Sequence, residues 1–353
     1  MVPAAAIGAD VPALLSATRA MVISCGADVP PAANPGMRLG AIIGEAANAR
    51  RNKLTILASE RLKPLGAWLE QLLAESTGKQ GKGVVPVDLE PPGDPAAYGG
   101  DRLFVHLKLE GDDDREIEAR IAALEGAGQP VVRIRLADPA LLGQEFFRWE
   151  IATAVAGAII GVNPFDQPDV EAAKAKTRRL VETYEQTGRL DLPEAVLREG
   201  QLSFFAAEGA PDAPALLKAL FDRLTPGGYL AFLAYIERNQ AHEAALSAMR
   251  VAVRDTRRVA TVGGFGPRFL HSTGQAYKGG PAGGVFLEIT MKADPDLAIP
   301  GKKASFGTVQ LAQALGDLDV LSERGRPWLR IHIDEDLDAG LDAIGRLVAA
   351  SLA

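Results

Sequence analysis

Five consecutive residues, Glu75-Ser76-Thr77-Gly78-Lys79, place a carboxylate beside hydroxyl, glycine and ammonium groups at the end of a predicted helix. Residues 78–83 contain three glycines and two lysines. One interpretation is structural: Gly78 ends the helix in the left-handed conformation, and Lys79 interacts with the helix dipole. The other is chemical. A carboxylate partly shielded from water at the negative end of a helix takes up a proton more readily, as proton abstraction beside a carbonyl requires, next to a loop that binds an anion.

A second segment, residues 163–174, has the sequence NPFDQPDVEAAK. Asp166 is a predicted N-cap, and Pro168 suits the first turn of a helix. Gln167 and Lys174 are seven residues apart, so one helix carries both on the same face, about 10 Å apart. A Gln donor at a helix start suits a phosphate, and a lysine two turns later suits proton donation. The same residues also make sense as helix punctuation alone.

A third segment, residues 263–284, is dense in glycine and follows a predicted strand at residues 259–262. Glycines let backbone N–H groups approach an anion closely. The segment also gathers titratable and hydroxyl side chains within a short span: Arg268, His271, Ser272, Thr273 and Lys278. A binding loop and an ordinary structural loop are both open interpretations.

Apolar periodicity predicts the elements that carry these segments. In the first half, strands are expected at residues 53–58, 84–87, 103–109 and 131–136, and helices at 62–75, 116–125 and 145–160. In the second half, strands are expected at residues 229–235, 259–262, 285–291 and 328–333, and helices at 215–224, 241–253, 306–324 and 337–352. Alternation of this kind predicts α/β units with parallel sheets. Pro86 makes the second strand an expected edge strand. Residues 177–200 are polar and are interpreted as the boundary between a domain at 1–190 and a second at 201–353.

Composition excludes several classes of protein. Apolar residues make up 47% and charged residues 24%, which is typical of a globular chain. A net charge of −7 argues against a nucleic-acid binder. Cys25 is the only cysteine, so neither an intrachain disulfide nor a cysteine zinc site is expected, which fits a cytoplasmic location. The longest mainly apolar stretch, residues 151–162, is too short to span a bilayer. His106 and His332 are interpreted as ordinary strand residues, and no metal site is expected.

Residues 73–79 (LAESTGK) together with residues 163–174 resemble signatures of the glucose-6-phosphate isomerase family. Residues 265–281 (FGPRFLHSTGQAYKGGP) and 306–316 (FGTVQLAQALG) are similar to the carboxyl-terminal part of bacterial transaldolase/glucose-6-phosphate isomerase fusions. The resemblance implies a flavodoxin-like sugar-isomerase (SIS) domain followed by a second α/β domain. It also implies interconversion of glucose 6-phosphate and fructose 6-phosphate through a cis-enediol, without a cofactor.

The resemblance further implies residue roles. Glu75 matches the family's general base, Lys174 the lysine that assists ring opening, and Gln167 a phosphate-binding glutamine. In the short bacterial enzymes of the family, the ring-opening histidine lies upstream of the Asn-Pro-Phe segment. This chain has no histidine between His106 and that segment, so His271 is a candidate replacement. The remaining expected substrate-binding residues are Ser76, Thr77, Gly78, Lys79, Arg268, Ser272 and Thr273.

The sequence departs from the family in one further respect, because it contains no Gly-Gly-Arg segment. In the family, the arginine of that segment stabilises the enediolate, and a Ser/Thr loop of the same upstream domain binds phosphate. The expected partners are therefore a hexose 6-phosphate and a missing amino-terminal isomerase domain or transaldolase domain, and a homo-oligomer is expected. Loss of such an oxyanion partner costs about 3 kcal/mol or more of transition-state stabilisation, so the chain alone is expected to be inactive or nearly so.

Two alternatives stay open. The chain could be a non-catalytic module that binds a phosphosugar and regulates a partner, in which case Glu75→Gln would be tolerated. Alternatively, residues from 201 onward could form an interaction domain that holds a transaldolase or a partner subunit.

Overall fold

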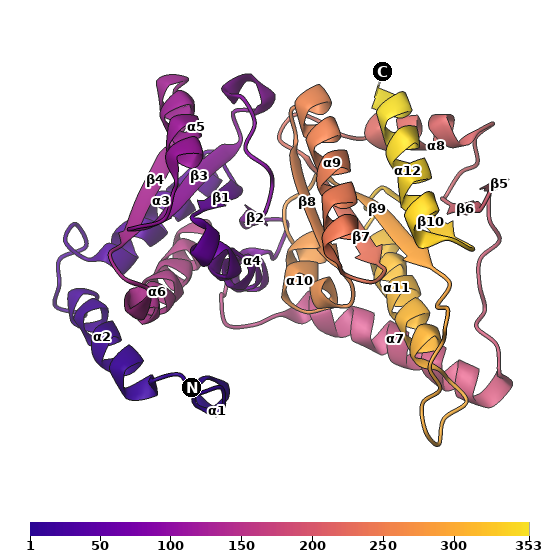
Figure 1. Cartoon of the computed structure of the whole chain (residues 1–353), viewed down its shortest axis with the longest axis horizontal. Helices are drawn as coiled ribbons and strands as arrows, with labels where there is room; N and C mark the ends of the chain where they lie inside the picture. Colours follow the sequence, from indigo (N-terminus) through magenta and orange to yellow (C-terminus); the bar gives the residue numbers. More distant parts are fainter. Residues whose placement is uncertain (353) are drawn as a thin grey trace. The chain divides into compact units, whose positions relative to one another are not determined.

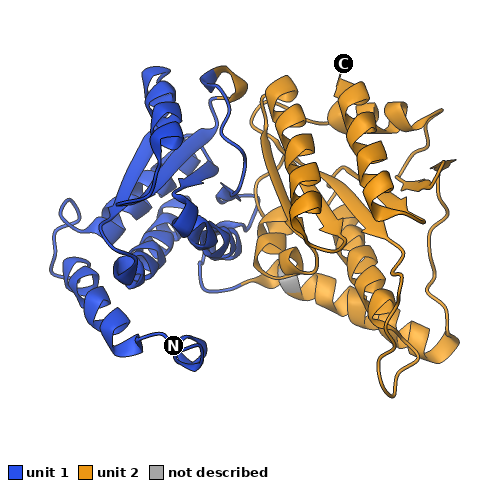
Figure 2. Cartoon of the chain, in the orientation of Figure 1, with its two compact units in different colours: residues 1–95, 100–166 blue, residues 96–99, 167–353 orange. Residues whose placement is uncertain are grey.

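The computed structural model describes residues 1–352, apart from the side chain of Val170, and it divides the chain into two compact units (Figure 1). Unit 1 comprises residues 1–95 and 100–166, and unit 2 comprises residues 96–99 and 167–353 (Figure 2). Each unit has its own sheet and its own hydrophobic core. The predicted α/β class is confirmed.

Unit 1 is built on a four-stranded parallel sheet with the strand order β2-β1-β3-β4. The strands are β1 (Lys53–Ala58), β2 (Val85–Val87), β3 (Arg102–Leu109) and β4 (Val131–Leu136). The helices are α1 (Val2–Ala6), α2 (Val11–Ser24), α3 (Pro35–Asn48), α4 (Lys63–Thr77), α5 (Arg115–Gly126) and α6 (Leu142–Ile160). β2 lies at an edge of the sheet, as Pro86 predicts, because proline has no backbone N–H to donate to a neighbouring strand.

The core of unit 1 lies between the sheet and helices α3, α4 and α6. Leucines recur along α4 at helical spacing, and Leu65, Leu69 and Leu73 are all buried in this core. Helix α5 instead packs on β4, and its buried Ile121 and Leu124 lie outside that cluster. The apolar face of α4 therefore fixes which residues at its end, including Glu75, can lie beside the core.

Unit 2 contains a six-stranded mixed sheet with the strand order β5-β6-β10-β9-β7-β8. Its strands are β5 (Leu197–Glu199), β6 (Leu202–Phe205), β7 (Tyr229–Tyr235), β8 (Ala260–Phe265), β9 (Gly284–Met291) and β10 (Trp328–Ile333). Its helices are α7 (Pro168–Thr187), α8 (Ala213–Phe221), α9 (Gln240–Arg257), α10 (Ser272–Gly279), α11 (Phe306–Glu323) and α12 (Leu337–Leu352). β7 to β10 pair in parallel, whereas β5 and β6 are antiparallel additions at one edge.

The two faces of the unit 2 sheet differ in chemistry. One face is mainly apolar, and helices α8, α9 and α12 cover it. The other face carries Tyr235, Glu288 and Arg330 beneath α10 and α11. Helix α7 packs on α10 and α11 rather than on the sheet.

Several sequence predictions differ from the structure. The expected boundary segment, residues 177–200, instead contains the second half of α7 and the edge strand β5. The expected first domain, residues 1–190, thus extends past the division at 166/167 by the whole of α7. The physical reason is packing, since α7 lies on α11 and the ammonium of Lys176 bonds both Asp319 and Glu323 at 2.6 Å. The amino-terminal helices and the antiparallel strands β5 and β6 lack the strong periodicity on which the predictions depended.

Among the described residues, no helix combines the length and apolarity that crossing a membrane requires.

Candidate functional site

Glu75 lies half-buried on the last turn of α4, two residues beyond the buried Leu73. The end of the helix is closed by Thr77, whose hydroxyl donates to the Leu73 carbonyl at 2.7 Å and accepts from the Val84 N–H at 2.9 Å. The prediction that Gly78 is left-handed is wrong, because its φ is −77°. The left-handed residues come later in the loop, at Gln80, Gly81 and Gly83. A carboxylate is therefore held beside the negative end of a rigid helix.

Lys79 joins the first two segments that the sequence singles out. Its side chain is only 3% exposed, and its ammonium donates to the Asn163 carbonyl at 2.6 Å and pairs with Asp166 at 2.9 Å. The hydrogen bond from Lys79 holds the pKa of Asp166 below its usual range. The Asn163 amide also donates to Asp166, and its oxygen accepts from the Phe165 N–H. Lys79 thus fixes the Asn-Pro-Phe-Asp turn, and its predicted contact with a phosphate stays a prediction.

Lys174 lies on α7, as the sequence predicts, whereas Gln167 lies just before the helix, so the two are not carried on one helix. Gln167 is the exposed N-cap residue, and its side chain makes no capping hydrogen bond. The Lys174 side chain is 41% exposed, and its ammonium donates to Glu171 at 2.8 Å. The lysine therefore lies near the solvent and keeps a carboxylate within proton-transfer distance. Asp166, the predicted N-cap, precedes the actual N-cap by one residue.

The glycine-dense third segment is not the open loop that the sequence predicts. It forms a 3-10 turn, η4 (Arg268–Leu270), followed by the mostly buried helix α10. Arg268 is half-buried and His271 is exposed at the start of α10, whereas Ser272 and Thr273 are buried. Both η4 and α10 pack on α7, so the structure brings this segment to the helix that carries Gln167 and Lys174.

Two glycines of this segment allow close approach between side chains. A Cβ on Gly274 would lie 2.4 Å from the Phe269 carbonyl oxygen and 2.8 Å from the Lys278 ammonium, and a Cβ on Gly279 would lie 2.2 Å from a carboxylate oxygen of Asp169. Local composition suggested an anion loop, but these glycines are needed where side chains cross the helix.

A buried group of ionisable residues, which sequence analysis missed, lies under α10 and α11. Lys278 forms an ion pair with Asp317, and both are almost completely buried. Glu288 faces this pair and Arg330, and burial raises the pKa of Glu288 well above its ordinary value, reinforced by the charge of Asp317. Burial and the same two carboxylates raise the pKa of Tyr235. A carboxylate within the apolar run 284–291 was the one signal available, because such residues are seldom buried unpaired.

The histidines in the strands are placed as the sequence predicts. His106 lies on β3 and is 1% exposed, and desolvation lowers its pKa. His332 lies on β10, where its Nδ1 is 2.9 Å from the Thr290 hydroxyl, and desolvation lowers its pKa as well. Within residues 1–352, no group of three or more His, Cys, Asp or Glu side chains could hold a metal ion.

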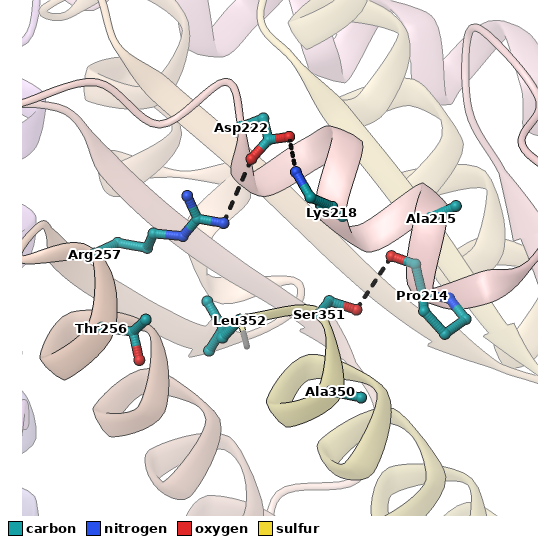
Figure 3. A pocket seen from close by; sticks show the side chains of 9 residues that line it. All are labelled: Pro214, Ala215, Lys218, Asp222, Thr256, Arg257, Ala350, Ser351 and Leu352. Atoms are coloured by element: carbon teal, nitrogen blue, oxygen red, sulfur yellow. Dashed lines mark hydrogen bonds and ion pairs between the residues drawn. The ribbon is translucent and has the colours of Figure 1, made fainter.

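Unit 2 also has a surface hollow of about 480 Å³ near the ends of α8, α9 and α12 (Figure 3). Asp222 accepts hydrogen bonds there from Lys218 at 2.6 Å and from Arg257 at 3.4 Å, so both cations already have a carboxylate partner. None of the residues that line it belongs to the predicted site.

Comparisons with known proteins relate the chain to sugar-phosphate isomerases over about half its length. No family model matches the chain. A glucose-6-phosphate isomerase of Rubrobacter xylanophilus is 32% identical over 222 residues, which cover 50% of this chain and 49% of that protein. A probable glucose-6-phosphate isomerase of Natronomonas pharaonis is 30% identical over 216 residues, covering 51% and 50% of the two chains. The chain thus spans about half the length of the curated relatives that it matches.

Among solved structures, a glucose-6-phosphate isomerase from Chlamydia trachomatis aligns over 96% of this chain and 72% of that chain. The sequence identity is 14% and the TM-score is 0.32, a correspondence too loose to bear on function.

Proposed function

We propose that this chain is a portion of an aldose–ketose isomerase that interconverts glucose 6-phosphate and fructose 6-phosphate. The similarity to glucose-6-phosphate isomerases over about half the chain carries the proposal. The position of Glu75, half-buried at the carboxyl end of α4, supports it, since a base needs a fixed carboxylate that is shielded in part from water.

In the proposed reaction, the Glu75 carboxylate takes the hydrogen on C2 of the open-chain aldose as a proton. The electrons of that C–H bond form the C1–C2 double bond of a cis-enediol as O1 gains a proton. Return of the proton from Glu75 to C1, with loss of the O2 proton, leaves the ketone at C2. Every proton removed is returned, so the reaction needs no oxidant or reductant.

The other roles belong to unit 2. Lys174 is proposed to assist opening of the sugar ring, and Gln167 to bind the phosphate at the start of α7. His271 is the proposed second ring-opening group, because η4 and α10, which flank it, both pack on α7. Among the predicted ligands of the third segment, Arg268 carries a positive charge and is half-buried, whereas Ser272 and Thr273 are neutral and buried.

The proposal is tested by exchange of the C1 hydrogen of fructose 6-phosphate with solvent deuterium, followed by NMR. Since the sequence contains no Gly-Gly-Arg segment, we expect slow exchange that is nonetheless above the protein-free rate. Glu75→Gln should reduce the exchange rate by about 10²-fold or more while leaving fructose 6-phosphate affinity nearly unchanged. Glu60→Gln, an exposed carboxylate just before the same helix, is the matched control.

The outcomes separate the two functional classes. Binding without exchange, equal in the protein and in Glu75→Gln, would favour a non-catalytic phosphosugar-binding module. Absence of both exchange and binding would overturn the proposal.

A further inference from the structure

A buried glutamine forms two hydrogen bonds with a residue in the first turn of α7. The Gln275 side chain is 0% exposed, its Oε1 accepts from the Asp169 backbone N–H at 2.8 Å, and its Nε2 donates to Asp169 Oδ2 at 2.8 Å. The other carboxylate oxygen of Asp169 accepts from Arg324 at 2.5 Å. A residue of α10 and the C-cap residue of α11 therefore hold one residue of α7 by its backbone and by both of its carboxylate oxygens.

Two glycines allow α10 and α11 to pack closely against α7. A Cβ on Gly279 would lie 2.2 Å from Asp169 Oδ2 and 2.9 Å from Gln275 Nε2, so the glycine is needed for the contact to form. Farther along α7, a Cβ on Gly316 would lie 2.8 Å from the Thr177 hydroxyl, which shows how closely α11 approaches. α7 is thus fixed at its start by side-chain hydrogen bonds and along its length by close packing.

Asp169, the residue that Gln275 holds, lies in the sequence between two residues of the proposed site. Asp169 follows the N-cap Gln167 by two positions and precedes Lys174 by five on the same helix. Because an α-helix is rigid over two turns, fixing one residue at three atoms sets both the rotation and the axial position of its neighbours.

We propose that Gln275 is a positioning residue, which holds the first turn of α7 so that Gln167 and Lys174 keep the geometry they need. This inference rests on the proposed function for the roles of those two residues. Gln275 itself contacts no substrate in the proposal. A glutamine suits the task since its neutral amide accepts from the backbone and donates to the carboxylate at the same time, whereas a glutamate would oppose Asp169.

The grip is tested by amide hydrogen exchange, read by mass spectrometry on peptides that span residues 164–176. Gln275→Leu removes both hydrogen bonds at similar size, and we expect opening of the first turn of α7 to become at least tenfold more frequent. Gln186→Leu, at an exposed position near the far end of α7, is the matched control and should leave this region unchanged. Unchanged protection in Gln275→Leu would overturn the proposal.

A polarity swap distinguishes positioning from general damage to the fold. Gln275→Glu places two carboxylates in contact and should lower deuterium exchange into fructose 6-phosphate at least tenfold. Adding Asp169→Asn restores a donor opposite the new acceptor, and both amide protection and the exchange rate should return to within about threefold of the original values. Failure of the double variant to recover either quantity would overturn a pairwise positioning role.

The two readouts separate this inference from the proposed function. If the unmodified chain shows no sugar exchange, the proposed function fails. The role of Gln275 in holding α7 is then tested by amide protection alone. If the unmodified chain and Gln275→Leu exchange sugar hydrogen equally, while α7 opens more often in the variant, the positioning role is refuted and the proposed function stands.

Discussion

Two lysines illustrate how differently the two units use the same residue type. Lys79 in unit 1 and Lys278 in unit 2 are each only 3% exposed, and each lies in a glycine-rich segment. The partner of Lys79 is Asp166, whose side chain is 54% exposed, whereas the partner of Lys278 is Asp317, whose side chain is 1% exposed. The carboxylate of the Lys79–Asp166 pair is therefore exposed to solvent, whereas both partners of the Lys278–Asp317 pair are buried.

The difference teaches that the cost of removing a buried cation depends on the anion it leaves behind. An exposed carboxylate regains hydration when its partner is lost, whereas a buried one stays uncompensated. The Lys278 pair also lies beside the buried Glu288, whose pKa the charge of Asp317 raises and the charge of Lys278 lowers. Lys79 fixes a turn, while Lys278 keeps an interior electrically balanced.

The largest predicted effect on stability follows from removing the cation of the buried Lys278–Asp317 pair. Lys278→Met should lower the free energy of unfolding by about 3–5 kcal/mol, because Asp317 is left as an unpaired buried charge. Denaturant titration followed by circular dichroism measures this loss.

A second variant keeps that prediction informative if Lys278→Met folds poorly. Lys278→Met with Asp317→Leu removes both charges, and it should recover most of the lost stability. A double variant no more stable than the single one would show that the pair is not the source of the effect.

The loss of Lys79 should cost less. Lys79→Met removes a charge-assisted hydrogen bond to the Asn163 carbonyl, and about 1.5–3 kcal/mol of unfolding free energy should be lost. The same titration provides the measurement, with Lys63→Met as a control at an exposed ion pair. If Lys79→Met lost as much unfolding free energy as Lys278→Met, the exposure of the partner carboxylate would not decide the cost.

The smallest effect concerns pH. Since burial raises the pKa of Glu288, the folded protein keeps this proton to higher pH than the unfolded chain does. Stability should therefore fall as the pH rises above the ordinary glutamate value, with a slope of at most about 1.4 kcal/mol per pH unit. Glu288→Gln should flatten this decline, whereas the exposed control Glu335→Gln should leave it in place. The groups that face Glu288 are Arg330 from β10, Asp317 from α11 and Lys278 from α10. A steeper decline in Glu288→Gln would refute the assignment.

Much of the fold could be predicted from sequence because its strands are strongly apolar. The strands at residues 53–58, 131–136, 229–235 and 328–333 have the predicted bounds. The sequence predicts the start of α7 but not its full length to Thr187. The reason is that α7 is charged along most of its length and packs on α10 and α11. The buried helix α10 was missed because its glycines suggested a loop.

The residues of the proposed site come from the sequence, whereas their contacts are seen only in the structure. Glu75 on α4 and Lys174 on α7 lie on helices that local patterns predict, and Gln167 lies just before α7 as its N-cap. The sequence predicts that Lys79 binds an anion, whereas its ammonium donates to a carbonyl of a turn 84 residues away. The sequence does not predict the hydrogen bonds between Asp169 and Gln275, because the two residues are 106 positions apart.

The amino-acid sequence by itself determined the α/β class, the main strands and the positions of the residues that resemble an isomerase site. Only the tertiary structure decided which lysines are internal partners and which glutamine holds α7. The physical reason is that apolar periodicity and helix ends depend on neighbours within a few residues. Burial and charge pairing depend on groups that folding brings together from distant parts of the chain.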